Sequence, residues 1–397
     1  MSLQLHIEKL VYGGEGLSRV GGEVVFTPFV LPGEIVEAER TEARKHVQRA
    51  RLLRVDAPSP DRMEPPCPVF GRCGGCQYQH AAYDAQLRFK RDILAETLRR
   101  VGKIEFDTAQ IGIESAEPFG YRNRAQFHFE SGRVGFREMN SRRLVAIEQC
   151  PISSPKINEI VAKLNRMVRD RRWPGFVRSL EIFTDERQVQ WNVLESEQPA
   201  AKRFFDWLAE EVPGTVTGPL EYAVNEDLFQ VNGTSFFQVN RFLLPRLAAL
   251  AIGEARGVSA WDLYAGVGLF SLTLARRFER VVAVEAGRSA GDLRHNAERA
   301  QSLVEVVGEQ TEVFLAKAKK APDFVLADPP RAGLGKAVVG RLAELRPAAL
   351  VVVACDPATL ARDLAALKAV YEIERITMVD LFPQTFHLET IVRLRMR

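Results

Sequence analysis

Four short apolar segments in the last third of the chain each end in a loop that carries flexible or reactive residues. They read SAWDLYAG, RVVAVEAG, DFVLADPP and ALVVVACDP, and a stretch with helical spacing of apolar residues follows each of them. Apolar strands that alternate with helices are typical of a parallel sheet covered on both faces. In such open sheets, ligands bind at the carboxyl ends of the strands. From about residue 235 onward the sequence therefore predicts an α/β domain with a ligand site where these loops meet.

The first two loops indicate that the ligand contains an adenosine. Gly266 and Gly268 follow the first strand, where glycines permit a tight turn and close approach of the backbone to a ligand. Glu285 ends the second strand, 23 residues after Asp262, where an acid accepts hydrogen bonds from a ribose diol. NAD and S-adenosylmethionine present the same adenosine, so these loops alone do not separate an oxidoreductase from a methyltransferase.

The fourth loop places Cys355 at the rim of the sheet. A single cysteine at the end of a strand more often serves only to pack as a small apolar side chain. A thiol at a ligand site, however, can also attack an electrophilic carbon. Carbon 5 of a pyrimidine needs such help, because thiolate addition at carbon 6 makes carbon 5 nucleophilic enough to accept a methyl group. The proton on carbon 5 must then be removed by a general base.

The segment FPQTFHLE offers His387 and Glu389 as that base. If residues 389–396 form an antiparallel edge strand, Glu389 begins it on the same rim as the loops and faces Cys355. A lone glutamate at a strand start is more often solvated, so the assignment depends on its neighbours.

These motifs resemble those of the S-adenosylmethionine-dependent RNA uracil-5-methyltransferases over nearly all of the 397 residues. FFQVN, DLYAGVGLFSL, VVAVE, ADPPRAG, ACDPATLARD and FPQTFHLE stand in the order and spacing of that family. The resemblance implies a Rossmann-like class I methyltransferase domain at residues 236–397. It also implies Cys355 as nucleophile and Glu389 as proton acceptor. Leu269 stands where many members carry asparagine, which removes one polar cofactor contact. The positions expected to contact the cofactor or the base are Gln238, Tyr264, Gly266, Glu285, Gln310 and Asp328.

The other four cysteines are Cys67, Cys73, Cys76 and Cys150. Four thiolates bind either zinc or an iron-sulfur cluster, and their spacing favours neither. The resemblance implies the [4Fe-4S] subgroup of the family. The spacing differs from the Cys-x3-Cys-x2-Cys of radical S-adenosylmethionine enzymes, so we expect a closed cluster with no radical chemistry.

The rest of the chain predicts two domains before the methyltransferase domain. Short β-rich segments with glycine turns at residues 1–56 favour a small OB-like barrel, which resembles the TRAM module and is expected to bind RNA. Residues 57–235 form an expected central α+β domain with the four cysteines, also RNA-binding.

Two basic stretches support RNA contacts, although solvated strand faces explain such runs about as often. Residues 40–54 carry a net charge of +5 and residues 121–143 a net charge of +4, the latter interleaved with aromatic residues. In the second stretch we expect the phenylalanines to point inward.

The absence of an apolar signal segment and of any run long enough for a membrane span predicts a cytoplasmic protein. No obligate protein partner is inferred from the sequence. The resemblance favours 23S ribosomal RNA as the substrate, with a transfer RNA T-loop uridine second. Two other classes stay open: an NAD-dependent oxidoreductase and a non-catalytic, cluster-containing RNA-binding protein.

Overall fold

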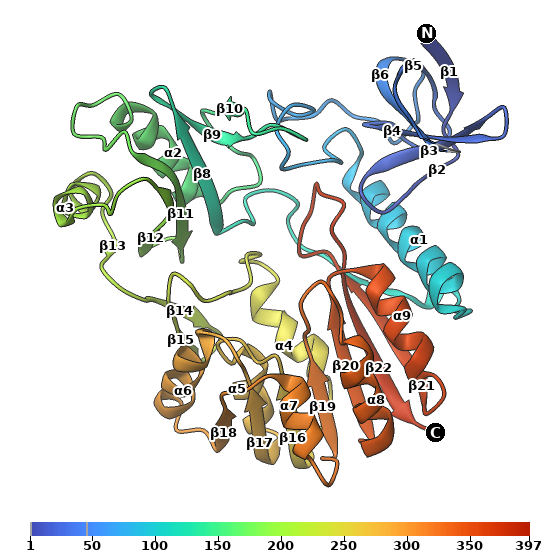
Figure 1. Cartoon of the computed structure of the whole chain (residues 1–397), viewed down its shortest axis with the longest axis vertical. Coiled ribbons are helices and arrows are strands. Elements are labelled where there is room, and N and C mark those ends of the chain that lie inside the picture. The colour runs from blue at the N-terminus through green and yellow to red at the C-terminus, as the bar shows by residue number, and fades with distance from the viewer. Residues whose placement is uncertain (1, 45–46) are drawn as a thin grey trace.

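The computed structural model describes residues 2–44 and 47–397, and describes residues 42–44 by their backbone alone. Figure 1 shows an N-terminal barrel (blue), a central part (green) and a C-terminal sheet (yellow to red) arranged around a common centre. Lys45 of the first basic stretch, and the side chains of Glu42 and Arg44, lie outside this description.

Six strands form the N-terminal barrel, in the order β1-β5-β6-β4-β3-β2. They are β1 (Ser2–His6), β2 (Lys9–Leu10), β3 (Glu15–Val20), β4 (Glu23–Pro28), β5 (Ile35–Arg44) and β6 (Val47–Ala57). Arginines of the first basic stretch form ion pairs with acidic side chains. Arg49 contacts Glu15 at 3.0 Å, and Arg51 contacts Glu39 at 2.5 Å. These pairs reduce the free positive charge of this face, and its contact with RNA stays a prediction.

The central part has its own sheet, in the order β10-β9-β8-β11-β12-β13, with two helices. Its elements are β8 (Arg124–Glu130), β9 (Arg133–Arg137), β10 (Leu144–Ala146), α2 (Pro155–Met167), β11 (Val177–Thr184), β12 (Val189–Ser196), α3 (Lys202–Glu211) and β13 (Thr215–Val216). Phe127 and Phe129 are buried in its core, which confirms that these phenylalanines point inward. Arg124 is buried as well, where it donates to Glu181 at 2.7 Å.

The C-terminal sheet has eight strands in the order β18-β17-β16-β19-β20-β22-β21-β7. Its strands are β7 (Gly112–Glu114), β16 (Gly257–Leu263), β17 (Phe278–Val284), β18 (Val304–Val307), β19 (Phe324–Ala327), β20 (Ala349–Ala354), β21 (Tyr371–Val379) and β22 (Glu389–Met396). The first five in sheet order are parallel, as the sequence predicted.

Helices cover both faces of this sheet, so its strands are buried on both sides. One face carries α1 (Tyr83–Gly102), α7 (Thr311–Lys317), α8 (Gly335–Leu345) and α9 (Pro357–Leu367). The other carries α4 (Leu244–Ile252), α5 (Leu269–Ala275) and the hairpin of β14 (Leu220–Val224) and β15 (Asp227–Val231). The helix α6 (Ser289–Arg299) packs beside β15 and β18, and a short 3-10 turn, η1 (Thr108–Gln110), follows α1.

Two expectations about the sheet were wrong. β22 is antiparallel, but it lies between β20 and β21 and is not an edge strand, because β21 and β7 extend the sheet beyond it. α1 and β7, which the sequence assigned to the central domain, pack with this sheet. Gly102 is the last residue of α1, and a Cβ there would lie 2.9 Å from the carbonyl oxygen of Ala361, so glycine permits α1 to approach α9.

A buried ion pair joins α1 to the loop between β21 and β22. Lys90 Nζ donates to Asp380 at 2.6 Å and to the carbonyl oxygen of Phe382 at 3.0 Å, and both charged side chains are almost fully buried. Tyr83 donates to the second oxygen of Asp380 at 2.9 Å. This pair therefore anchors the loop that leads to Glu389.

Replacing Lys90 with methionine should destabilise the protein by about 3–5 kcal/mol, because it leaves the Asp380 carboxylate buried without its cation. Urea unfolding followed by fluorescence measures the change. The matched control is Lys319→Met at an exposed position, which should change the free energy of unfolding by less than about 0.5 kcal/mol. A Lys90→Met variant as stable as this control would contradict a structural role for the pair.

Candidate active site

A cavity of about 470 Å³ opens at the carboxyl ends of the parallel strands. It brings together predicted site residues from six separate segments of the chain, namely Gln238, Tyr264, Gly266, Glu285, Asp328, Cys355 and Glu389. Gln310 is exposed at the start of α7 and is not part of this lining. The adenine-side contact expected of Gln310 thus has no support from the geometry.

The turn between β16 and α5 lines part of the cavity. Tyr264 and Gly266 have φ angles of 64° and 57°, and a Cβ on Gly266 would meet open space. The backbone N–H of Gly266 donates to Glu285 at 2.9 Å, and that of Gly287 donates to its other oxygen at 2.8 Å. The carboxylate is therefore held in place beside a turn that leaves room for a ligand.

The cavity also presents a thiol and two carboxyl groups. Asp328 follows β19, Cys355 follows β20 and Glu389 begins β22. Glu389 is buried, and its Oε1 atom has no hydrogen-bond partner among the described residues. Burial, with a smaller contribution from Asp328, raises the pKa of Glu389 well above its ordinary value. A buried, unpartnered carboxyl group at a cavity wall is suited to exchange a proton with a ligand.

His387, the other candidate base, is less suited to the task. It lies in contact with the aromatic rings of Phe382 and Phe386, at centroid distances of 5.6 and 4.3 Å. Burial, followed by the positive charge of Arg331, lowers its pKa to about 4. The imidazole is therefore neutral and weakly basic at neutral pH.

Burial, with the nearby Glu389 and Asp328, raises the pKa of Cys355 to about 11. The thiol is thus mostly protonated at neutral pH in the absence of RNA. Because only the thiolate reacts, alkylation of Cys355 by iodoacetamide should become about tenfold faster for each pH unit between about 7 and 9. Mass spectrometry of the peptide that contains Cys355 measures this rate. A rate that levels off below about pH 8 would contradict the raised pKa.

The segment before α4 supplies Gln238 and an aromatic pair. Phe237 is buried, whereas Phe236 is 65% exposed at the mouth of the cavity. Leu269 also lines the cavity, so the position where many family members have asparagine is apolar here. The sequence did not single out Phe236, Phe382 or Ser289 as lining residues, because nothing in their local pattern distinguishes them from core positions.

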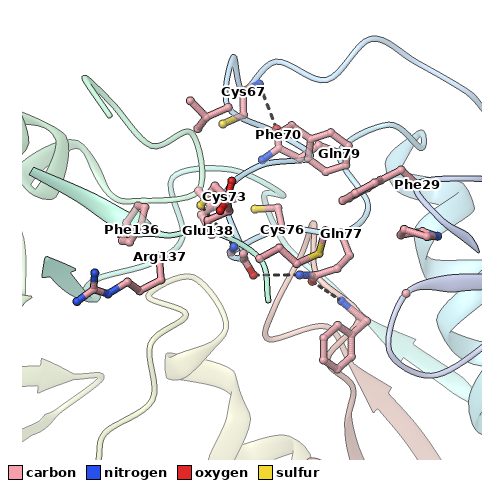
Figure 2. A pocket seen from close by; sticks show the side chains of 18 of the residues that line it. Phe29, Cys67, Phe70, Cys73, Cys76, Gln77, Gln79, Phe136, Arg137 and Glu138 are labelled. Atoms are coloured by element: carbon pink, nitrogen blue, oxygen red, sulfur yellow. Dashed lines mark hydrogen bonds between the residues drawn. The ribbon is translucent and has the colours of Figure 1, made fainter. Parts of the chain in front are cut away.

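Cys67, Cys73, Cys76 and Cys150 line one cavity of about 700 Å³ between the barrel and the central sheet. Figure 2 shows the side chains of the first three around it. Within the described residues, no three histidine, cysteine or acidic side chains stand close enough to hold a metal ion. The structure brings the four thiols to one cavity but does not arrange them as a closed ligand set.

Known proteins resemble this chain over its whole length. An RNA methyltransferase of Aquifex aeolicus is 34% identical, with 100% of this chain and 99% of the relative covered. One of Halalkalibacterium halodurans is 31% identical, with coverages of 100% and 97%. The family described as tRNA (Uracil-5-)-methyltransferase matches residues 312–397, and the TRAM domain matches residues 3–53.

A solved structure is similar to nearly the entire fold. The tRNA (uracil-54, C5)-methyltransferase of Pyrococcus abyssi, in complex with S-adenosyl-L-homocysteine, has a TM-score of 0.80 and 26% identity. The match covers 99% of this chain and 100% of that one.

The C-terminal sheet and its cavity, together with these similarities, define an S-adenosylmethionine-dependent methyltransferase whose N-terminal barrel is a TRAM domain. The chain belongs to the RNA uracil-5-methyltransferase family. The two alternatives, an NAD-dependent oxidoreductase and a non-catalytic RNA-binding protein, are therefore wrong. No helix within residues 2–44 and 47–397 combines the length and the hydropathy that a membrane span requires.

Proposed function

We propose that the enzyme methylates carbon 5 of a uridine by transient covalent attachment of the base to Cys355. The thiol loses its proton to solvent water, and Sγ bonds to carbon 6. The electron pair of the double bond between carbons 5 and 6 moves onto the resulting enolate, which makes carbon 5 nucleophilic. The turn around Gly266 and Glu285 would hold S-adenosylmethionine, which would supply the methyl group and leave as S-adenosylhomocysteine. Glu389 then takes the proton from carbon 5, and the bond between Sγ and carbon 6 breaks to release the methylated base.

The observation that carries this proposal is the placement of Cys355 and the unpartnered Glu389 in one cavity. They come from adjacent antiparallel strands, since Ala354 pairs with Thr390 in the sheet. The cofactor fits the same cavity, because the cavity lining includes a tight glycine turn and a fixed carboxylate. Asp328 and Gln238 line the cavity where they can contact the base or the cofactor.

The substrate we propose first is 23S ribosomal RNA, which the cysteine pattern and the TRAM domain favour. A second candidate is the T-loop uridine of transfer RNA. The full-length similarity to the Pyrococcus abyssi enzyme, which acts on uracil 54 of tRNA, supports this second candidate.

Methylation of unmodified transcripts tests both candidates. The full-length enzyme, purified without oxygen, is incubated with labelled S-adenosylmethionine and either RNA, and 5-methyluridine is mapped by mass spectrometry. A 5-methyluridine in 23S ribosomal RNA supports the first candidate, and one in the T-loop supports the second. No 5-methyluridine in either would sink the proposed function.

We also propose that Cys67, Cys73, Cys76 and Cys150 hold a closed [4Fe-4S] cluster. Four thiols that line one cavity are the donor set that such a cluster requires. When bound, the cluster would connect the segment of residues 67–76 to Cys150, which follows β10 of the central sheet. Protein purified without oxygen should contain about four iron and four sulfide per chain, and Cys73→Ser should lower both. Zinc with no sulfide would contradict the cluster.

A further inference from the structure

The hairpin that joins β2 and β3 projects from the barrel and packs against the C-terminal domain. Leu10, at the end of β2, is buried in the same apolar core as Leu94 and Leu98 of α1. Lys9 forms an ion pair with Glu96 of α1. The barrel is therefore fixed to the methyltransferase domain at this hairpin.

The turn of the hairpin is shaped by two glycines. Gly13 and Gly14 have φ angles of 111° and 89°, which side chains other than glycine rarely adopt. A Cβ on Gly14 would lie 2.9 Å from Gln77 Cβ and 3.6 Å from Phe386 Cβ. The glycines thus let the turn lie directly against Gln77, which follows Cys76, and against Phe386 in the loop before Glu389.

This turn carries Tyr12 to the residue that we propose as nucleophile. The Tyr12 hydroxyl donates to the carbonyl oxygen of Cys355 at 3.2 Å. Its ring meets that of Phe386 edge to face, with the centroids 5.4 Å apart. Burial, with a smaller contribution from Asp356, raises the pKa of Tyr12 above its ordinary value, so the hydroxyl remains a donor at working pH.

Tyr12 lies in the wall between the two cavities. Tyr12 and Phe386 line the cavity of the four cysteines, whereas Cys355 and His387 line the active-site cavity. The hydroxyl reaches the backbone of Cys355 and is not part of the active-site lining. An effect of the Tyr12 hydroxyl on the reaction is therefore expected through the backbone of Cys355, which is the group that it contacts.

The backbone around Cys355 is fixed from two sides. On one side, the Asp356 side chain accepts from the N–H groups of Ala358 and Thr359 at 3.0 and 2.8 Å and begins α9. On the other side, Tyr12 holds the carbonyl group at the end of β20. The peptide between them sets the direction in which the thiol points.

We propose that Tyr12 of the TRAM domain is a positioning residue for Cys355. The TRAM domain then contributes to the chemical step as well as to RNA binding. This inference rests on the proposed function, in which Cys355 attacks the uracil.

Covalent trapping tests this role. RNA that contains 5-fluorouridine should stay bonded to the enzyme, because fluorine at carbon 5 does not leave as a proton. With saturating 5-fluorouridine transcripts of 23S ribosomal RNA and transfer RNA, Tyr12→Phe should form the adduct about five- to tenfold more slowly than the parent. The dissociation constants for RNA and S-adenosylmethionine should change by less than about twofold.

The matched control is Tyr371→Phe, which removes a hydroxyl that donates to the carbonyl oxygens of Leu342 and Pro347 and does not contact Cys355. This control should form the adduct at the parental rate. Adduct formation by Tyr12→Phe at the parental rate, or a change in RNA affinity alone, would overturn the positioning role. If the parent itself forms no adduct on Cys355, the proposed function fails as well.

Discussion

Replacement of Cys355 by alanine should lower methyl transfer to RNA by about 10⁴-fold or more, because carbon 5 of uracil does not attack a sulfonium methyl group without prior thiolate addition. Incorporation of labelled methyl groups into unmodified RNA measures the loss. No covalent complex with 5-fluorouridine RNA should form.

Binding of S-adenosylmethionine provides the control for this variant. Cys355 follows β20, which lies two strands from β16 and three strands from β17, the strands that precede Gly266 and Glu285. The dissociation constant for the cofactor should therefore change by less than about twofold. A variant that keeps more than about 1% of the parental rate would show that the thiol is not the nucleophile.

Replacement of Glu389 by glutamine should stop the reaction at a later step. The amide has nearly the same shape but does not accept the proton from carbon 5, so turnover should fall by about 10²–10⁴-fold. Because Cys355 is intact, the reaction should proceed through methyl transfer. A covalent complex between the enzyme and RNA without 5-fluorouridine, in which carbon 5 already carries the new methyl group, should therefore accumulate. Denaturing gel electrophoresis with methyl-labelled cofactor detects this complex.

His387→Asn is the informative comparison for Glu389→Gln. If Glu389 is the base, the His387 variant should release its product and accumulate no complex. Accumulation in the His387 variant, with normal turnover in Glu389→Gln, would transfer the role of base to His387.

The sequence predicts the C-terminal site well, because its chemistry lies at strand ends. Apolar strands followed by Gly266, Glu285, Asp328 and Cys355 place four loops at one edge of a parallel sheet. This local pattern determines which residues meet, and the structure brings them together. Gln310 is the exception: it is exposed at the start of α7 and is not among the residues that line the cavity.

The sequence does not predict contacts between parts that are distant in the chain. β7 and α1 precede the central sheet in sequence, yet they complete the C-terminal domain, and β21 and β7 convert β22 from an edge strand into an internal one. Tyr12 lies 343 residues before Cys355. A tyrosine before two glycines indicates a turn, but its tertiary partner depends on how the barrel docks.

The composition of the covalent complex tests the central claim most directly. The parent enzyme is incubated with S-adenosylmethionine and 5-fluorouridine RNA, digested, and analysed by mass spectrometry. One peptide, which contains Cys355, should carry a fluorouracil nucleotide with one added methyl group. Methylation of ordinary RNA without any such adduct, or an adduct on a different residue, would contradict it.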